Sequence, residues 1–92
     1  MLVKFFATYR QIAHCKSFVL EGGQPATVRD LLDYLGQRWP DFKPLLLSPD
    51  KTALGPDAIV MVNGRHIDHL EGIATPLSTD DAVAVLPLVA GG

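Results

Sequence analysis

The hydrophobic positions of the chain have helical spacing in one segment and strand-like spacing in several others. After Thr27, apolar residues recur every three or four positions with polar residues between them: Val28, Leu31, Leu32 and Leu35. The Thr27 hydroxyl can cap the first turn, where Asp30 favours the positive end of the helix dipole. Pro40 interrupts the pattern, so the spacing predicts a helix that ends near residue 38 or 39.

Five segments have the composition and alternation of strands: residues 2–8, 16–21, 58–62, 65–68 and 82–86. In the first of them, alternation directs Val3, Phe5 and Ala7 to the side of the helix and leaves Phe6 on the opposite face. Asn63-Gly64 separates the third and fourth strands and predicts a tight hairpin, because both residues tolerate a positive φ.

The other segments connect these elements. Residues 9–15 are expected to turn the chain, and Leu45-Leu46-Leu47, between two prolines, is expected to form one helical turn or a connector. The order is therefore β-β-α-β-β-β. It predicts an α+β fold in which a mixed five-stranded sheet surrounds one main helix.

Length and composition narrow the class of protein. The 92 residues form one domain, and the formal net charge of −2 argues against a nucleic-acid partner or a basic membrane patch. No apolar run approaches the ~20 residues of a membrane span, and the first residues lack the pattern of a signal peptide. The one cysteine, Cys15, can form no internal disulfide, so a cytoplasmic protein is expected.

The sequence finishes with Leu86-Pro87-Leu88-Val89-Ala90-Gly91-Gly92. Two glycines without side chains make a thin segment with wide conformational freedom. Pro87 is expected to stop the last strand, which would leave residues 87–92 as a flexible tail that bears the Gly92 carboxylate.

Several motifs resemble the MoaD/ThiS sulfur carriers, a family with the ubiquitin-like β-grasp fold, and above all its MoaD branch. The resemblance spans the chain, and its motifs are Phe5-Phe6-Ala7-Thr8-Tyr9-Arg10, Thr27-Val28-Arg29-Asp30-Leu31-Leu32, Val62-Asn63-Gly64, the segment 76–83, and the terminal Leu86 to Gly92. Two positions depart from the pattern, since Leu86 stands for the usual Phe and Leu88 for the second Pro.

The resemblance implies a carrier rather than an enzyme. A ubiquitin-activating-type (MoeB/ThiF-like) enzyme would use ATP to adenylate Gly92, and a sulfur donor protein would convert it to a thiocarboxylate. As the small subunit of molybdopterin synthase, the chain would then pass sulfur to a pterin inside a larger MoaE-like subunit. The alternatives are a carrier for thiamin, cysteine or another product, and a ubiquitin-like modifier that is joined to lysines.

The resemblance and the strand alternation together suggest which residues meet partners. Gly91 and Gly92 would enter the active sites. Phe6 and Leu86 would share the sheet face away from the helix, with Met61 and His66 beside them, and the partner's channel would hold the following segment: Pro87, Leu88, Val89 and Ala90. A plain interaction domain with an inert tail is the remaining possibility.

Two other groups of residues are of a type that can bind a metal or react. His66 and His69 flank Asp68, but they lie on a hairpin return and no second ligand pair has the usual spacing, so no metal and no bound cofactor are expected. Cys15 lies between His14 and Lys16, where nearby cations would lower the pKa of a thiol, but a lone loop cysteine is more often incidental.

Overall fold

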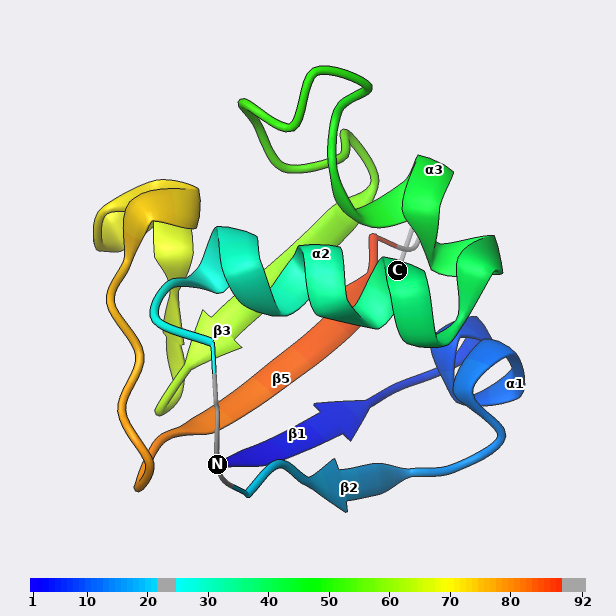
Figure 1. Cartoon of the computed structure of the whole chain (residues 1–92), viewed down its shortest axis with the longest axis horizontal. Coiled ribbons are helices and arrows are strands. Elements are labelled where there is room, and N and C mark those ends of the chain that lie inside the picture. Colours follow the sequence, from blue (N-terminus) through cyan, green and yellow to red (C-terminus); the bar gives the residue numbers. More distant parts are fainter. Residues whose placement is uncertain (22–24, 89–92) are drawn as a thin grey trace.

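The computed structural model describes residues 1–21 and 25–88. A five-stranded sheet lies against one long helix, α2, with shorter helices at the ends of the sheet (Figure 1). The strands are β1 Leu2–Phe5, β2 Ser17–Val19, β3 Ala58–Val62, β4 Arg65–His66 and β5 Ala82–Pro87. The helices are α1 Thr8–Ala13, α2 Val28–Arg38 and α3 Lys43–Leu46, with 3₁₀ turns η1 Pro40–Phe42, η2 Ile67–His69 and η3 Gly72–Ala74.

The last strand occupies the centre of the sheet, whose order is β2-β1-β5-β3-β4. β5 runs parallel to β1 and antiparallel to β3, and β1–β2 and β3–β4 are antiparallel pairs. This mixed sheet around one main helix confirms the predicted fold class. Because β5 is central, whatever follows it begins at the middle of one sheet edge.

Helix α2 forms as the sequence predicts. The Thr27 hydroxyl accepts a hydrogen bond from the Asp30 N–H at 3.3 Å, which satisfies one of the open donors of the first turn. The helix ends at Arg38, before Pro40. Its apolar side is fully covered, and the buried residues are Val28, Leu31, Leu32 and Leu35.

The sheet buries the alternate residues that face this helix. Val3 and Phe5 of β1, Val60 of β3 and Val85 of β5 are all 0% exposed. Fully burying a side chain of this size contributes about 1.5–3 kcal/mol, so this layer is the main source of stability. Phe42 closes one end, where its ring lies 5.4 Å from the ring of Phe5.

The first strand is shorter than predicted, and the segment 9–15, expected to turn the chain, does so as a helix that the sequence did not predict. β1 ends at Phe5, and α1 occupies Thr8–Ala13. Ala7 adopts a φ of 51°, which redirects the chain and takes it out of the strand with an exposed side chain. The helix forms because Tyr9 and Ala13, four residues apart, bury their side chains on one side of it.

The other boundaries also differ from the prediction. β2 covers only Ser17–Val19, and the expected strand over residues 65–68 stops after His66. His66 Nδ1 accepts a hydrogen bond from the Asp68 N–H at 3.0 Å and so caps η2, which buries Ile67. For Leu45-Leu46-Leu47, one helical turn or a connector is expected: Leu45 and Leu46 lie in α3, and Leu47 follows it and forms an isolated bridge with Leu54.

The hairpin prediction is confirmed. Asn63 and Gly64 have φ values of 51° and 83°, as a two-residue turn between twisted strands requires. The Asn63 side chain also joins this turn to the start of β5. Its amide donates to Asp81 Oδ1 at 2.9 Å, and its oxygen accepts from the Ala82 N–H at 2.9 Å.

Candidate docking face and tail root

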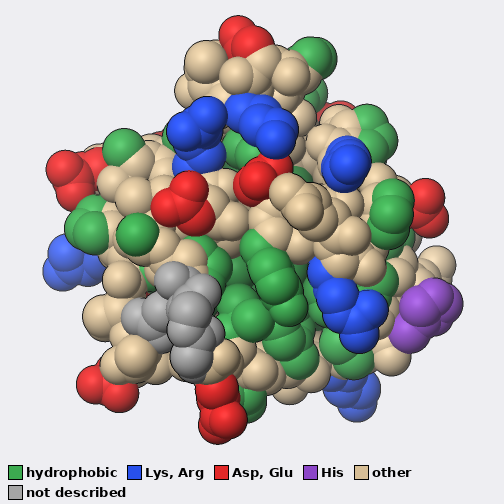
Figure 2. All heavy atoms as spheres, in the orientation of Figure 1, with side chains coloured by type: hydrophobic (Ala, Val, Ile, Leu, Met, Phe, Trp, Pro, Cys, Tyr) green, Lys and Arg blue, Asp and Glu red, His purple; other side chains and the backbone are tan. Residues whose placement is uncertain are grey.

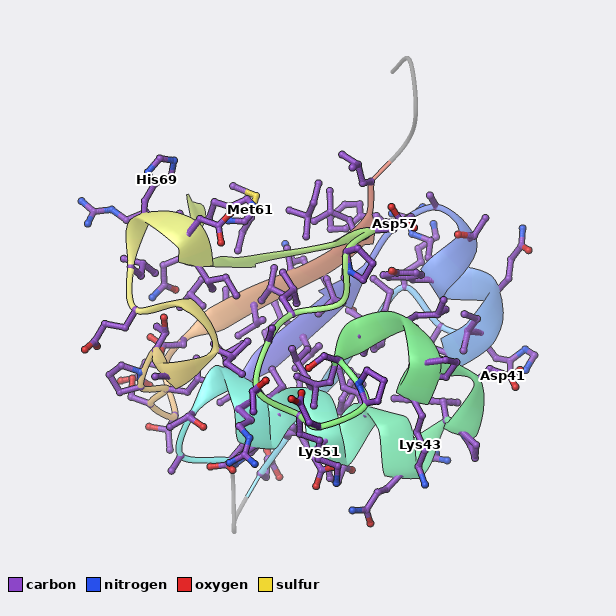
Figure 3. All side chains as sticks on the ribbon, turned by 90° about the horizontal axis from the view of Figure 1, so that it is seen from above. Asp41, Lys43, Lys51, Asp57, Met61 and His69 are labelled. Carbon is purple, nitrogen blue, oxygen red and sulfur yellow. The ribbon has the colours of Figure 1, made fainter. Side chains whose placement is uncertain are left out.

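The face of the sheet that α2 does not cover carries half-exposed apolar side chains. Along β3, Ile59 and Met61 point outward between buried neighbours, and on β5 Leu86 follows the buried Val85 and is itself partly exposed. Figure 3 shows Met61 on the opposite side of the molecule from Lys43 and Lys51, which lie with the helices. We call Ile59, Met61 and Leu86 the outer face.

Strand register brings these residues together. Ile59 is the direct partner of Leu86, and Met61 is the direct partner of both Ala84 and His66. Lys4 pairs with Ala84 from the other side, so a cation and an imidazole flank the apolar centre. Directly opposed residues lie about 4.5–5.5 Å apart, which makes the patch continuous. Sequence reasoning had missed Ile59, although its alternation with Ala58 and Val60 is the same signal that selected Met61.

Phe6 lies at the border of this face. It directly follows β1 and is 36% exposed, whereas Phe5 is 0% exposed. The Phe5–Val85 pair is the last of the parallel ladder, so Phe6 is not itself paired with Leu86. Arg10 packs over Phe6, with its guanidinium carbon 5.3 Å from the ring centroid, and its Nε donates to the Phe5 carbonyl at 2.8 Å. A positive charge therefore accompanies the exposed aromatic ring.

The segment expected to be a free tail is attached to the domain at its beginning. Pro87 is the last residue of β5 and pairs with Ala58, which corrects the expectation that the strand stops before it. Successive N–H groups of a strand point to opposite sides. The N–H of Leu88 donates to the Asp57 carbonyl at 2.7 Å, so Pro87 removes no hydrogen bond on that side. The Leu88 side chain is 57% exposed. Val89, Ala90, Gly91 and Gly92 lie outside the described residues.

A depression of about 380 Å³ adjoins Leu88. Its walls come from β3, from the loop that precedes it and from the region after the hairpin: Leu54, Gly55, Pro56, Ala58, Ile59, His66, Asp68 and Leu88. The outer face, the imidazole of His66 and the root of the tail thus meet at one hollow that is large enough for a partner's side chain.

Helix α1 supports the tail root from the other side. It packs against β5 through its buried residues, including Tyr9, which is 3% exposed. Burial raises the pKa of the Tyr9 phenol, and the negative charge of Asp57 raises it further. Tyr9 is therefore a packing residue, and its ring lies against Phe42 with the centroids 5.4 Å apart.

The structure also places the His66–His69 pair and Cys15. His66 is engaged as the cap of η2, and among residues 1–21 and 25–88 no three His, Cys, Asp or Glu side chains gather as a metal site would require. Cys15 is half-buried and packs against the core. Within the same ranges, no helix is long and apolar enough to cross a bilayer.

Comparison with known proteins assigns the family. The ThiS family model matches residues 3–92. Small archaeal modifier protein 3 of Haloferax volcanii is 38% identical over 90 residues, which are 98% of this chain and 96% of that protein. The chain belongs to the ThiS/MoaD family of ubiquitin-like sulfur carriers.

Solved structures agree with this assignment. The small archaeal modifier protein 1 of Methanosarcina acetivorans superposes with a TM-score of 0.81 and 32% identity, over 99% of this chain and 94% of that one. A putative molybdopterin converting factor subunit 1 of Pyrococcus furiosus gives 0.75 and 30%, over 96% and 95%. The relatives bear the names of modifiers and of a molybdopterin subunit, so the family is established and the MoaD branch is not singled out.

Proposed function

We propose that this protein carries an activated C-terminal carboxyl group, at Gly92, between an adenylating enzyme and an acceptor. The observation that carries the proposal is the tail root. The central strand of the sheet runs to the edge of an exposed apolar face, and its last described bond to the domain is made by Leu88. The family match, which extends through residue 92, supports the same role.

The length beyond the tail root sets a geometric condition on partners. Four residues follow Leu88, and a chain extends at most about 3.3–3.6 Å per residue, so Gly92 can reach no more than ~14 Å from Leu88. An activating enzyme must therefore hold ATP at about that depth from the surface on which the outer face rests. The distance from the docking surface to the ATP site then decides whether Gly92 reaches the ATP.

The chemistry needs no side chain of this protein. The Gly92 carboxylate oxygen attacks the α-phosphorus of ATP and pyrophosphate leaves, which gives an acyl adenylate. A persulfide of the donor protein then attacks the carbonyl carbon and AMP leaves, which gives an acyl disulfide. A second thiol of the donor attacks the S–S bond, so that the thiocarboxylate leaves and the donor becomes a disulfide. Glycine suits positions 91 and 92 because a Cβ would widen a segment that must enter more than one active site. ATP and catalytic groups belong to the partners, and this chain is their cosubstrate.

The outer face is the docking surface in this proposal. A ubiquitin-activating-type enzyme of the MoeB/ThiF kind would cover Phe6, Ile59, Met61 and Leu86, with Arg10 at the border. Burying aromatic and aliphatic side chains at the centre of an interface yields most of the binding energy, and a rim charge steers the approach. His66 and the hollow beside Leu88 would receive the part of the partner nearest the tail.

Two fates of the activated carboxyl group remain, and a different relative favours each of them. The 38% identity to small archaeal modifier protein 3 favours attack by a lysine amine, which forms an isopeptide bond and releases AMP. Transfer of sulfur to a pterin within a MoaE-like large subunit is the second fate, and the Pyrococcus furiosus neighbour favours it. Both fates require the same adenylate.

The activation step is tested by ATP–pyrophosphate exchange with the activating enzyme of the same organism. Exchange should depend on this protein and should be lost when Gly92 is deleted, with an unchanged melting curve. Adding a MoaE-like subunit and pterin precursor, or lysine-bearing proteins, then separates the fates. Exchange that persists without Gly92 would contradict the proposal.

A further inference from the structure

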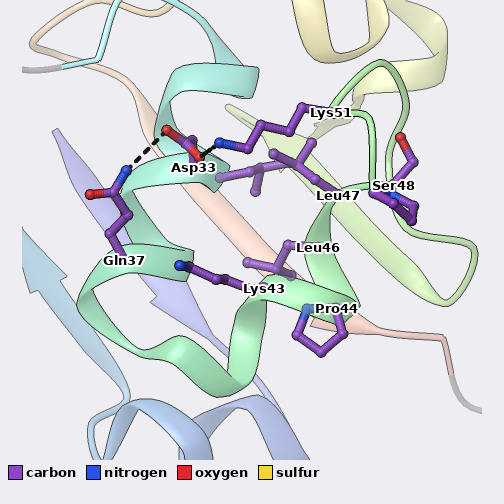
Figure 4. Close-up of a pocket in the computed structure, with 11 residues that line it drawn as sticks. Asp33, Gln37, Lys43, Pro44, Leu46, Leu47, Ser48 and Lys51 are labelled. Atoms are coloured by element: carbon purple, nitrogen blue, oxygen red, sulfur yellow. Dashed lines mark hydrogen bonds and ion pairs between the residues drawn. The ribbon is translucent and has the colours of Figure 1, made fainter.

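A second concave site lies on the helix side of the molecule. It is a pocket of about 460 Å³ between the second half of α2, helix α3 and the loop that follows α3 (Figure 4). Its lining residues are Leu32, Asp33, Gly36, Gln37, Lys43, Pro44, Leu46, Leu47, Ser48, Pro49 and Lys51. The volume falls within the ~300–1,000 Å³ of sites that hold small molecules or single side chains.

The floor of the pocket is apolar and firmly held. Leu32, Leu46 and Leu47 are at most 7% exposed and belong to the core. Gly36 supplies a wall without a side chain, and a Cβ there would stand 3.0 Å from Lys43 Cγ. A glycine inside a helix costs about 1 kcal/mol relative to alanine. In return, this one lets the stem of Lys43 pack closely along α2 at the pocket mouth.

The rim of the pocket is cationic. Lys51 Nζ lies 2.7 Å from Asp33 Oδ1, and the Gln37 amide donates to Asp33 Oδ2 at 3.3 Å (Figure 4). Lys51 holds the pKa of Asp33 below its usual value, so this carboxylate is charged and already engaged on both oxygens. Arg29 adds a third cation nearby, because its Nε donates to the Lys51 carbonyl at 2.8 Å.

Lys43 takes no part in these interactions among Lys51, Asp33, Gln37 and Arg29. It is exposed, and within residues 1–21 and 25–88 it forms no ion pair. Asp50, in the loop that follows α3, accepts hydrogen bonds from the hydroxyl groups of Ser48 and Thr52, both at 2.7 Å. Figure 2 shows lysine and arginine side chains between α2 and this loop, with acidic side chains directly beside them.

The pocket is separate from the proposed docking face. Lys43 and Lys51 lie on the helix side of the sheet and Met61 on the other (Figure 3). A partner seated in the pocket would therefore leave the outer face and the tail root uncovered. The two surfaces can be occupied together, as a protein that meets several partners requires.

We propose that this pocket binds an acidic segment of a partner protein, which inserts one apolar side chain between Leu32, Leu46 and Leu47. Lys43 pairs with a carboxylate next to that side chain, and Lys51 and Arg29 attract the rest of the segment. The apolar floor selects the inserted residue, and the cationic rim selects the charge around it. This inference does not depend on the chemistry at Gly92.

Three synthetic peptides of equal length test the proposal against the ¹⁵N-labelled full chain by NMR titration. Asp-Glu-Phe-Leu-Glu-Asp carries both features, Asp-Glu-Ser-Ser-Glu-Asp lacks the apolar pair, and Lys-Lys-Phe-Leu-Lys-Lys has the opposite charge. Only the first should bind saturably, with amide shifts concentrated at Gly36, Leu46 and Leu47. Equal binding of all three, or shifts concentrated at Ile59 and Met61, would overturn the proposal.

Charge variants supply the second half of the test. Lys43→Gln removes the charge and keeps the stem beside Gly36, and it should weaken binding of the acidic apolar peptide several-fold. Lys43→Glu should weaken it about tenfold, the size of one reversed charge contact. Lys16→Glu makes the same change at an exposed site outside the pocket and should change affinity less than twofold. Unchanged affinity in both Lys43 variants would refute the site.

Discussion

Arg10 fixes the position of Phe6: its guanidinium carbon lies 5.3 Å from the Phe6 ring centroid while its Nε donates to the carbonyl of the preceding residue at 2.8 Å. One side chain thus joins α1 to the end of β1 and holds an exposed aromatic ring in one place. A ring held in this way loses little conformational freedom on binding, which is the property of an interface anchor.

Phe6→Asp should therefore weaken binding to the activating enzyme far more than it weakens folding. Phe6 is 36% exposed, so a charge there can stay in water in the free protein, but a carboxylate covered by a partner loses hydration and has only Arg10 beside it. We expect a loss of ~2 kcal/mol or more in binding, measured by calorimetry, with a nearly unchanged melting curve.

Phe5→Asp is the matched control, because Phe5 is 0% exposed and lies against the rings of Phe42 and Trp39. It should unfold the domain, as seen by circular dichroism. If Phe6→Asp folds and binds as tightly as the parent, the partner does not cover the outer face at this point.

Ala7→Gly should raise stability. The φ of 51° and ψ of −133° at Ala7 is a conformation that glycine adopts readily and that costs a residue with a Cβ about 1–3 kcal/mol. The greater freedom of glycine in the unfolded chain offsets part of this, which leaves a net gain of about 1 kcal/mol. Urea denaturation measures it as a higher midpoint with the same slope.

Ala13→Gly provides the comparison, since the same substitution there falls in α1 at a residue 4% exposed. It should lower the midpoint, because glycine weakens a helix and loses a buried methyl group. If both variants lower the midpoint, Ala7 is not strained.

Asp81 should make folding stability depend on pH in the acid range. The Asn63 amide donates to Asp81 Oδ1, and the Ser78 N–H donates to Oδ2 at 2.8 Å, and these bonds lower the pKa of the carboxyl group. Because the folded pKa lies below the unfolded one, the stabilisation is complete above the ordinary Asp value of ~3.9 and disappears as pH falls through the folded value.

Asp81→Asn should accordingly cost roughly 0.5–1 kcal/mol at pH 7, a modest value because the site is partly exposed. The difference from the parent should shrink between pH 5 and pH 3 in urea titrations. Asp80→Asn, at a neighbour with no hydrogen bond in the described part of the chain, should change stability by less than about 0.5 kcal/mol. A difference that grows on acidification would contradict this assignment.

The sequence predicts those parts of the fold in which local signals and tertiary packing agree. The spacing of Val28, Leu31 and Leu35 and the cap at Thr27 define α2, and Asn63-Gly64 defines the hairpin. Helix α1 escaped prediction because its apolar residues are few and a strand-like run leads into them. Tertiary packing against β5, β1 and Phe42 stabilises these six residues as a helix.

The outer face and the pocket on the helix side likewise differ in how far the sequence predicts them. Met61 and Leu86 follow from alternation, and Ile59 could have been found by it, whereas the position of Phe6 depends on the bend at Ala7. The pocket on the helix side could not be predicted, because Lys43 and Lys51 approach α2 only through the fold of α3 and its loop. The role proposed for Gly92 rests on the tail root at Leu88 and on the family match, which extends through residue 92.

The most direct test of the central claim is the intact mass of this protein after incubation with its activating enzyme, ATP and a sulfur donor. If Gly92 is the carrier terminus, the O-to-S exchange should add about 16 Da, and fragmentation should place the change on Gly92. A chain with Gly92 deleted should gain nothing. An unchanged mass, with the same enzyme active on another carrier of the family, would contradict the account.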